Sequence, residues 1–255
     1  MNLDIDGRVA VISGGTSAIG RAVARRLGNA SGRVAVTWRH DHTAAVRLVG
    51  SLRADGVDAC AVELDLGDAG SIDRALDTVR ETLGAPSILV HNAVEWPTST
   101  QWLVDRDSVD TLRRSLDTNL VGPYQLTVGA LPNMVTQRWG RIVFVSTGLV
   151  DDGLDGSSAY VTAKSGLHGL TRVMSRELGR FGILTNVVMP GFTQTDQERP
   201  AQLVATVEDA TATGRLTLPD DIASCVAFLV SAANGHVTGE RIRVDGHFLS
   251  PHVRR

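Results

Sequence analysis

The sequence predicts a doubly wound α/β fold, in which a parallel sheet of about seven strands carries helices on both faces within one domain spanning residues 1–255. Two observations predict it. Short runs of apolar and β-branched residues recur along the chain, and amphipathic helical patterns alternate with them. Strands that are apolar almost throughout indicate a sheet covered on both faces, and right-handed crossovers make such a sheet doubly wound. No linker-like stretch divides the chain.

The first half repeats a unit of strand, turn and helix. The run 8–13 (RVAVIS) leads directly into Gly14, Gly15 and Thr16 and then into a helical pattern at 18–27. The following strands are expected at 33–38, 57–63 and 87–91, with helices at 43–54 and 71–83.

The second half continues the alternation, with a long helix at its start and a short strand at its end. Helices are expected at 107–137, 158–180 and 219–232, and strands at 141–145, 184–189 and 241–244. Residues 194–214 lack a helical or strand pattern. A loop of this length in a compact domain is more often a lid or binding loop than filler. The alternative is a poorly ordered surface segment.

Composition excludes several classes of partner. The formal charge is -3 and the pI is near 6.2, so the chain has no broad positive potential that would attract nucleic acid or an anionic membrane. No apolar stretch reaches the roughly 18 residues that a membrane span needs. Cys60 and Cys225 lie in apolar surroundings without metal-ligand spacing, which predicts free thiols, no metal site and a reducing cytoplasm.

The glycine-rich turn after the first strand is suited to a pyrophosphate. It opens a helix, where unpaired backbone N–H groups and the helix dipole favour an anion. At the end of the second strand, where NAD would require an acidic residue for its ribose hydroxyls, the chain has Arg39. Because arginine pairs with a 2′-phosphate, NADP(H) is favoured over NAD(H), although Asp41 is close by. Asp65 could accept a hydrogen bond from the adenine amine or serve as a negative charge at a helix N-terminus. Asn92-Ala93 could form the floor of the nucleotide site or only a turn.

Tyr160 and Lys164 are predicted to form the catalytic pair. They lie one helical turn apart, and Lys164 is the only lysine in the chain. A free tyrosine has a pKa near 10, and a neighbouring cation favours the phenolate, so we expect Lys164 to make Tyr160 more acidic. A phenol that gives its proton to a carbonyl oxygen during hydride transfer acts as a general acid. The alternative is a partly buried tyrosine beside a solvated lysine.

Two further polar positions complete the predicted chemistry. Ser146 and Thr147 follow the strand 141–145 at the carboxyl edge of the sheet, where such folds bind ligands. Since successive strand side chains point to opposite faces, only one of the two hydroxyls should reach the substrate. Asn119 is a polar residue within an apolar helical stretch, and its alternative role is a locally bonded amide.

With these residues in place, the chain resembles the short-chain dehydrogenase/reductase family over residues 8–248. The resemblance rests on motifs that follow the family's order: the glycine turn, Asp65-Leu66, Asn92-Ala93, Asn119-Leu120-Val121-Gly122, Ser146-Thr147, Tyr160 to Lys164, and Pro190-Gly191-Phe192-Thr193-Gln194-Thr195.

The resemblance implies a Rossmann-type fold and a tetrad of Asn119, a hydroxyl residue, Tyr160 and Lys164, with the asparagine supporting a proton-relay water. The family's active hydroxyl lies thirteen residues before the tyrosine, which selects Thr147 and leaves Ser146 as the alternative. Lysine would also bind the nicotinamide ribose, and the segment after Pro190 would hold the carboxamide. The expected cofactor-binding residues are Gly14, Thr16, Ser17, Ile19, Gly20, Arg39, Asp65, Leu66, Asn92, Ala93, Tyr160, Lys164, Pro190, Gly191, Thr193 and Thr195.

The sequence departs from the family pattern at three places. Ala18 replaces a glycine of the turn, His91 and Val94 flank Asn92-Ala93, and Thr147 supplies a bulkier hydroxyl. None of these changes removes a group that the chemistry requires, so an active enzyme is expected. The substrate pocket is expected to contain Val94, Trp96 and Leu149, together with the loop after Thr195.

Within the family, the chain looks most like the 3-oxoacyl-acyl-carrier-protein reductases and polyketide ketoreductases. These enzymes bind an acidic carrier protein through arginines near the mouth of the active site. Arg138 and Arg180 are the candidates for this contact in the present chain. The alternatives are a reductase or dehydrogenase of a free small ketone, sugar or cyclic alcohol, and a nucleotide-binding scaffold without catalysis. The resemblance also implies a homotetramer built on the helices of residues 107–137 and 158–180.

Overall fold

A computed structural model describes residues 3–30, 32–96, 103–104 and 108–248. Its seven strands form one parallel sheet in the order β3-β2-β1-β4-β5-β6-β7, which confirms the predicted fold class. The strands are β1 (Val9–Ser13), β2 (Arg33–Trp38), β3 (Ala59–Glu63), β4 (Ile88–His91), β5 (Gly140–Val145), β6 (Ile183–Pro190) and β7 (Arg241–Val244).

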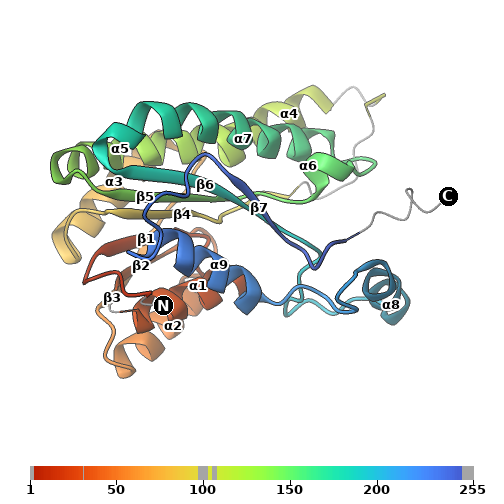
Figure 1. Cartoon of the computed structure of the whole chain (residues 1–255), viewed down its shortest axis with the longest axis horizontal. Coiled ribbons are helices and arrows are strands. Elements are labelled where there is room, and N and C mark those ends of the chain that lie inside the picture. Colours follow the sequence, from red (N-terminus) through yellow and green to blue (C-terminus); the bar gives the residue numbers. More distant parts are fainter. Residues whose placement is uncertain (1–2, 31, 97–102, 105–107, 249–255) are drawn as a thin grey trace.

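Helices cover both faces of this sheet, as Figure 1 shows. One layer contains α1 (Ala18–Asn29), α2 (His42–Ala54) and α9 (Pro219–Val230), whose apolar side chains pack with one face of the strands. The other layer contains α3 (Ala69–Thr82), α4 (Ser108–Leu116), α5 (Gly122–Gln137) and α7 (Ser158–Leu178). Since successive side chains of a strand point to opposite faces, each strand contributes to both cores.

The long helix expected at 107–137 is interrupted. Its predicted first residue lies outside the described part of the chain, and a π-helical turn, Asp117–Val121, separates α4 from α5. The interruption coincides with a close approach, because a Cβ on Gly122 would lie 2.7 Å from the Cβ of Leu66. A π-turn inside a helix rotates side chains out of the regular spacing and is frequent at functional sites.

Two short helices were not expected from the sequence. Residues 201–210, inside the segment without a clear pattern, form α8 (Ala201–Ala210), and α6 (Leu149–Asp152) follows β5. Only Val207 and Ala210 of α8 are buried, so it offers little apolar periodicity to read. Figure 1 places α6 and α8 at the end of the sheet toward which β5 and β6 run.

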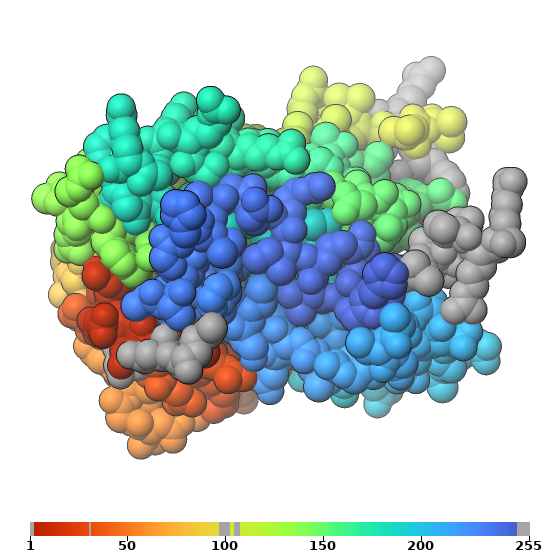
Figure 2. Space-filling model, viewed as in Figure 1, coloured from red at the N-terminus to blue at the C-terminus, as the bar shows by residue number. Residues whose placement is uncertain are grey.

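The order in which the strands are added reverses between β1 and β4, two neighbouring strands near the centre of the sheet. From β1 the order runs outward to β2 and β3, and from β4 it runs to β5, β6 and β7 in the other direction. Ligands of doubly wound folds bind beyond the carboxyl ends of the strands at such a switch point. In Figure 2 the blue C-terminal part of the chain lies across one face of the molecule between the two helical layers.

Two other predictions can be compared with the structure. Cys60 and Cys225 are free, as expected, and burial raises the pKa of each thiol to about 11. Among the described residues, none of the helices combines the length and the apolar character required to cross a membrane.

Candidate active site

The glycine turn closes β1 and opens α1 at the switch point. Gly14 has a positive φ of 62°, and a Cβ there would lie 2.7 Å from the Cα of Ala93, so only glycine fits without strain. Ser17 caps α1 by accepting from the backbone N–H of Gly20 at 3.1 Å. The turn therefore places the N-terminus of α1 beside the segment that follows β4. A helix N-terminus in this position is suited to a pyrophosphate.

Asn92 fixes this turn from the end of β4. Its side-chain amide donates to the carbonyl oxygens of Ser13 and Gly14, at 3.2 and 2.9 Å, and to the hydroxyl of Ser17 at 3.0 Å. The sequence left open whether Asn92 floors a nucleotide site or only makes a turn. In the structure it joins β4 to the glycine turn, so its contact with a ligand would be indirect.

Tyr160, Thr147 and Lys164 meet at the carboxyl end of β5. Both Tyr160 and Lys164 are buried, and the side chain of Thr147 is close enough to the phenol to lower the pKa of Tyr160. The ammonium of Lys164 donates to the carbonyl oxygen of Val145 at 2.9 Å and lies 6.0 Å from the centroid of the Tyr160 ring. Because an ammonium has three N–H donors, further donors remain for a polar ligand such as a ribose.

The expected acidification of Tyr160 is not found. Burial raises the pKa of Tyr160 to about 12, against a smaller lowering effect of the neighbouring Thr147 side chain. Burial also lowers the pKa of Lys164 to about 8. The sequence shows the neighbouring cation but not the loss of water on folding, which disfavours the charged form of both groups. At neutral pH the phenol keeps its proton and is a proton donor.

Ser146 points away from this centre. Its hydroxyl lies 2.8 Å from Nε2 of the buried His168, whose Nδ1 lies 3.3 Å from a guanidinium nitrogen of Arg241. Because a guanidinium only donates, Nδ1 is the acceptor, so Nε2 carries the proton and donates to Ser146. Of the two candidate hydroxyls, the structure brings only that of Thr147 to Tyr160.

Asn119 lies in the π-turn and is fully buried. Its side chain accepts from the backbone N–H of Glu95 at 2.9 Å and donates to the carbonyl oxygen of Glu95 at 3.0 Å and to the Ser115 hydroxyl at 3.1 Å. Local amide bonding, the alternative to a catalytic role, accounts only for the bond to Ser115, and the other two bonds hold the segment after β4.

Arg39 does not extend freely at the end of β2. Its guanidinium forms ion pairs with Glu95 at 3.0 Å and Asp65 at 3.6 Å, and its Nε donates to Nε2 of His40 at 2.8 Å. Asp65 also accepts from the backbone N–H of Gly67 at 2.8 Å. The sequence does not indicate Glu95 as a site residue, because no pattern near it shows that its partner is Arg39, 56 residues earlier.

The segment after β6 lies next to the same edge. The N–H of Gly191 bonds the carbonyl oxygen of Val244 at 3.0 Å, and the hydroxyl of Thr193 donates to the carbonyl oxygen of Gly191 at 3.0 Å. Arg21, which no local sequence pattern indicates, donates to the carbonyl oxygen of Thr16 at 2.7 Å and pairs with Asp196. It thereby links the glycine turn to the loop after β6.

Comparison with known proteins assigns the family. A family profile described as enoyl-(acyl carrier protein) reductase matches residues 14–248. The chain is 32% identical to the 3-oxoacyl-[acyl-carrier-protein] reductases FabG of Pseudomonas aeruginosa and Aquifex aeolicus, over 96% of its own length and 98% and 99% of theirs. The chain belongs to the short-chain dehydrogenase/reductase family.

A solved structure supports the same assignment. A crystal structure provisionally described as a gluconate dehydrogenase of Agrobacterium tumefaciens matches with a TM-score of 0.90 and 28% identity, over 98% of this chain and 99% of that one. The chain is therefore an NAD(P)-dependent oxidoreductase acting on CH–OH groups. The glycine turn and the N–H donors of Lys164 that bind no other described residue fit the dinucleotide that this short-chain dehydrogenase/reductase requires.

The residues expected around the substrate differ in their exposure. Trp96 is half exposed, and its ring lies over that of Tyr160 with the centroids 4.4 Å apart. Val94 is also half exposed, and Leu149 is the first residue of α6, two residues after Thr147. Trp96 thus forms one wall beside the phenol of this short-chain dehydrogenase/reductase.

Arg138 and Arg180 lie together but not beside Tyr160. Arg138 ends α5 and donates to the carbonyl oxygen of Arg180 at 2.7 Å. Arg180 follows α7, whose 21 residues separate it from Tyr160 by about 30 Å at 1.5 Å per residue. Within one chain these arginines therefore lie away from the mouth of the candidate site, contrary to the expectation. They precede β5 and β6, whereas Thr147 and Tyr160 lie at the other end of the sheet.

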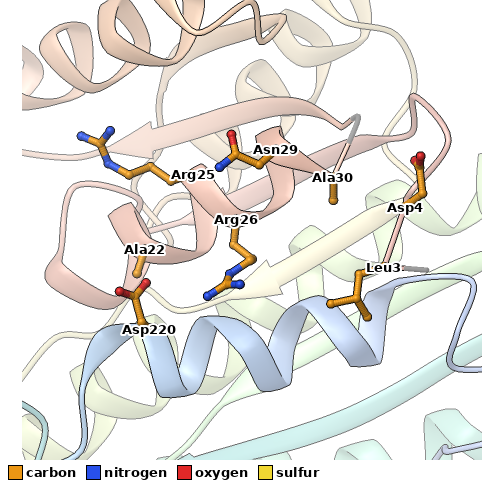
Figure 3. A pocket seen from close by; sticks show the side chains of 8 residues that line it. All are labelled: Leu3, Asp4, Ala22, Arg25, Arg26, Asn29, Ala30 and Asp220. Atoms are coloured by element: carbon orange, nitrogen blue, oxygen red, sulfur yellow. The ribbon is translucent and has the colours of Figure 1, made fainter. Parts of the chain in front are cut away.

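A separate hollow lies on the opposite helical layer. It has a volume of about 450 Å³ and lies between α1, α9 and the N-terminal segment (Figure 3). Its walls carry Leu3, Asp4, Ala22, Arg25, Arg26, Asn29, Ala30 and Asp220. Since Tyr160 and Lys164 lie on α7 in the other layer, this hollow is not the catalytic cleft of the short-chain dehydrogenase/reductase.

Proposed function

We propose that the protein is an NADPH-dependent ketoreductase whose substrate is a 3-oxoacyl thioester of the acyl-carrier-protein type. The observation that carries the proposal is the contact of Thr147 with the buried, protonated Tyr160, above the ammonium of Lys164. Three groups that can serve one carbonyl oxygen lie together at the switch-point edge of the sheet.

The roles of these residues follow from their chemistry. The nicotinamide, when bound, supplies the hydride. Thr147 donates a hydrogen bond to the substrate oxygen, and Tyr160 delivers its proton as negative charge develops there. Lys164 orients the nicotinamide ribose and returns a proton toward Tyr160. Because the side chain of Asn119 is committed to Glu95 and Ser115, its support of a relay water would fall to its backbone in the π-turn.

NADP(H) is proposed as the cofactor because of Arg39. A guanidinium at the end of β2 is suited to a 2′-phosphate, since phosphate accepts two parallel N–H donors. Its present partners, Glu95 and Asp65, are carboxylates that a phosphate could replace. The test is a comparison of NADPH and NADH in steady-state kinetics, and equal kcat/KM values would contradict this preference.

The relatives support the thioester substrate. Two of them are named 3-oxoacyl-[acyl-carrier-protein] reductases. The structural neighbour described as a gluconate dehydrogenase favours the alternative, a free small ketone, sugar or cyclic alcohol. A panel separates the two: acetoacetyl thioesters and simple ketones are assayed with NADPH and NADH, and gluconate is assayed with NADP+ and NAD+, each followed by nicotinamide absorbance. A kcat/KM for gluconate or a simple ketone above that of every thioester would support the alternative.

The protein is proposed to form a homotetramer and to bind an acyl carrier protein. Exposed apolar side chains gather on the layer formed by α4, the π-turn, α5 and α7: Val109, Val121, Tyr124, Val128 and Val173. Such a patch favours association. A two-fold axis across α7 would pair this helix antiparallel with that of a second copy. That pairing would bring the second copy's counterparts of Arg138 and Arg180 toward the Tyr160 end of α7.

Two measurements test these partners. Light scattering on the eluted protein should give four times the 27.1 kDa chain mass. Titration with acidic carrier protein should change the reductase kinetics saturably, and a change to glutamine at Arg138 and Arg180 should remove that effect. A monomer in solution would contradict the tetramer, and unchanged kinetics would contradict the carrier.

A scaffold that binds nucleotide without turnover is the remaining alternative. This alternative predicts that the protein binds the cofactor but turns over none of the compounds in the panel. The proximity of Tyr160, Thr147 and Lys164 disfavours it, because binding alone needs no buried proton donor. A cytoplasmic location, expected from the cysteine content, stays a prediction.

A further inference from the structure

The ion pair between Arg39 and Glu95 spans the switch point of the sheet. Arg39 follows β2, Glu95 follows β4, and β1 with its glycine turn lies between these two strands. The guanidinium and the carboxylate are 3.0 Å apart. The side chain expected to bind the cofactor's 2′-phosphate is therefore held across the edge where the adenosine half is expected to lie.

The cluster around Arg39 carries more negative than positive charge. One guanidinium faces two carboxylates, Glu95 and Asp65, while His40 accepts from its Nε and so presents a neutral ring nitrogen. A 2′-phosphate would add further negative charge to this group. It can bind Arg39 strongly only by displacing a carboxylate, since a charge-assisted pair requires direct access to the N–H donors.

Glu95 is the carboxylate nearer to Arg39 and the less restrained of the two. Asp65 accepts from the backbone N–H of Gly67 at 2.8 Å, whereas the only other group bonded to the Glu95 carboxylate among the described residues is the Thr118 hydroxyl, at 3.5 Å. The two hydrogen bonds between Asn119 and Glu95 involve the backbone of Glu95 and not its side chain. A change of the Glu95 side chain therefore leaves the contact with Asn119 in place.

We propose that Glu95 determines the cofactor preference by competing with the 2′-phosphate of NADP(H) for Arg39. This inference rests on the proposed use of NADP(H). The enzyme then discriminates between the two cofactors less strongly than Arg39 alone would allow, because part of its attraction for phosphate is offset by an internal carboxylate.

The test measures how adenosine 2′,5′-bisphosphate and 5′-AMP bind to the purified protein by calorimetry, since these probes differ only in the 2′-phosphate. Glu95→Gln should tighten the bisphosphate roughly three- to tenfold and change 5′-AMP by less than about twofold. Glu95→Met, which cannot accept a hydrogen bond from Arg39, should act in the same direction. An unchanged ratio of the two affinities in both variants would overturn the inference.

Two further variants separate this competition from other effects. Glu63→Gln removes an equal charge from the exposed end of β3, next to Trp38 in register, where the described residues show no ion pair to Arg39. It should leave the ratio unchanged, and an effect as large as that of Glu95→Gln would overturn the inference in favour of general electrostatics.

The second is Arg39→Met, alone and combined with Glu95→Gln. If Glu95 acts through Arg39, the effect of Glu95→Gln on the ratio disappears in the Arg39→Met background. If Arg39→Met by itself leaves the ratio at the wild-type value, the proposed NADP(H) preference fails. If Arg39→Met lowers the ratio while Glu95→Gln leaves it unchanged, only the role of Glu95 fails.

Discussion

The indole of Trp96 lies over the phenol ring of Tyr160, with the ring centroids 4.4 Å apart and the planes tilted by 54°. Trp96 is half exposed, whereas Tyr160 is 7% exposed, so the indole shields the tyrosine from solvent on one side. The same shielding contributes to the burial that raises the pKa of Tyr160 to about 12.

Replacing Trp96 with alanine should therefore change both the pocket and the acidity of Tyr160. Water would reach the phenol, and its pKa should fall toward 10 by about one unit, because desolvation is the largest cause of the upward shift. Alcohol oxidation needs the phenolate, so its acid limb should move to lower pH. Measured pH profiles of oxidation check this, and Trp96→Phe, which keeps an aromatic cover, is the control.

Tyr160→Phe should reduce kcat by about 10²–10⁴-fold, the usual contribution of general acid–base catalysis. The ring remains, so packing against Trp96 and the fold should be preserved. Cofactor binding, followed by nicotinamide fluorescence, should be close to wild type. Tyr124→Phe is the matched control, because Tyr124 is the only other tyrosine and is half exposed on α5. Turnover that survives the change at Tyr160 would contradict the proposed mechanism.

The two adjacent hydroxyls should behave differently when removed. Thr147→Val should lower kcat/KM by about 10²-fold or more, because it removes a donor to the substrate oxygen while keeping the side-chain shape. The effect on thermal stability should be small. An equal loss of activity from Thr147→Val and Ser146→Ala would contradict the assignment of Thr147.

Ser146→Ala should instead reduce stability. It leaves the N–H of His168 without its acceptor in a buried site, which costs about 1–3 kcal/mol. For a chain of this size each kcal/mol corresponds to about 2–4 °C in Tm. Calorimetric unfolding together with steady-state kinetics would separate the two substitutions.

The candidate catalytic group could be predicted because its members are close in sequence or fixed by the topology. Tyr160 and Lys164 are one helical turn apart, and Thr147 directly follows a strand whose end had to lie at the ligand-binding edge. The central fold was predicted for a similar reason, since buried parallel strands and amphipathic helices have strong local patterns.

The remaining features depend on contacts between distant residues. The pairing of Arg39 with Glu95 spans 56 residues and that of Arg241 with His168 spans 73, and no local pattern specifies either. The sign of the pKa shift at Tyr160 depends on how much water the folded chain removes. The sequence gives the charge of Lys164 but not the burial that outweighs it.

Lys164→Met tests the balance between function and stability at the centre of the site. Burial lowers the pKa of Lys164 from 10.5 to about 8, so holding its charge in the folded state at pH 7 is unfavourable. Removing the charge should abolish turnover and stabilise the apo protein by about 1 kcal/mol, a gain reduced by the loss of the hydrogen bond to the Val145 carbonyl. That corresponds to a rise of about 2–4 °C in Tm.

The pH dependence of this gain has a definite sign. Between pH 8 and 10.5 the unfolded wild-type chain binds the Lys164 proton and the folded chain does not, so the wild type gains stability from this group as pH rises. The advantage of Lys164→Met should therefore be full below pH 8 and shrink across that window. Paired denaturant unfolding of both proteins at pH 7 and pH 9.5 measures it. A stability difference that stays constant or grows with pH would mean that the lysine is not buried as an unfavourable charge.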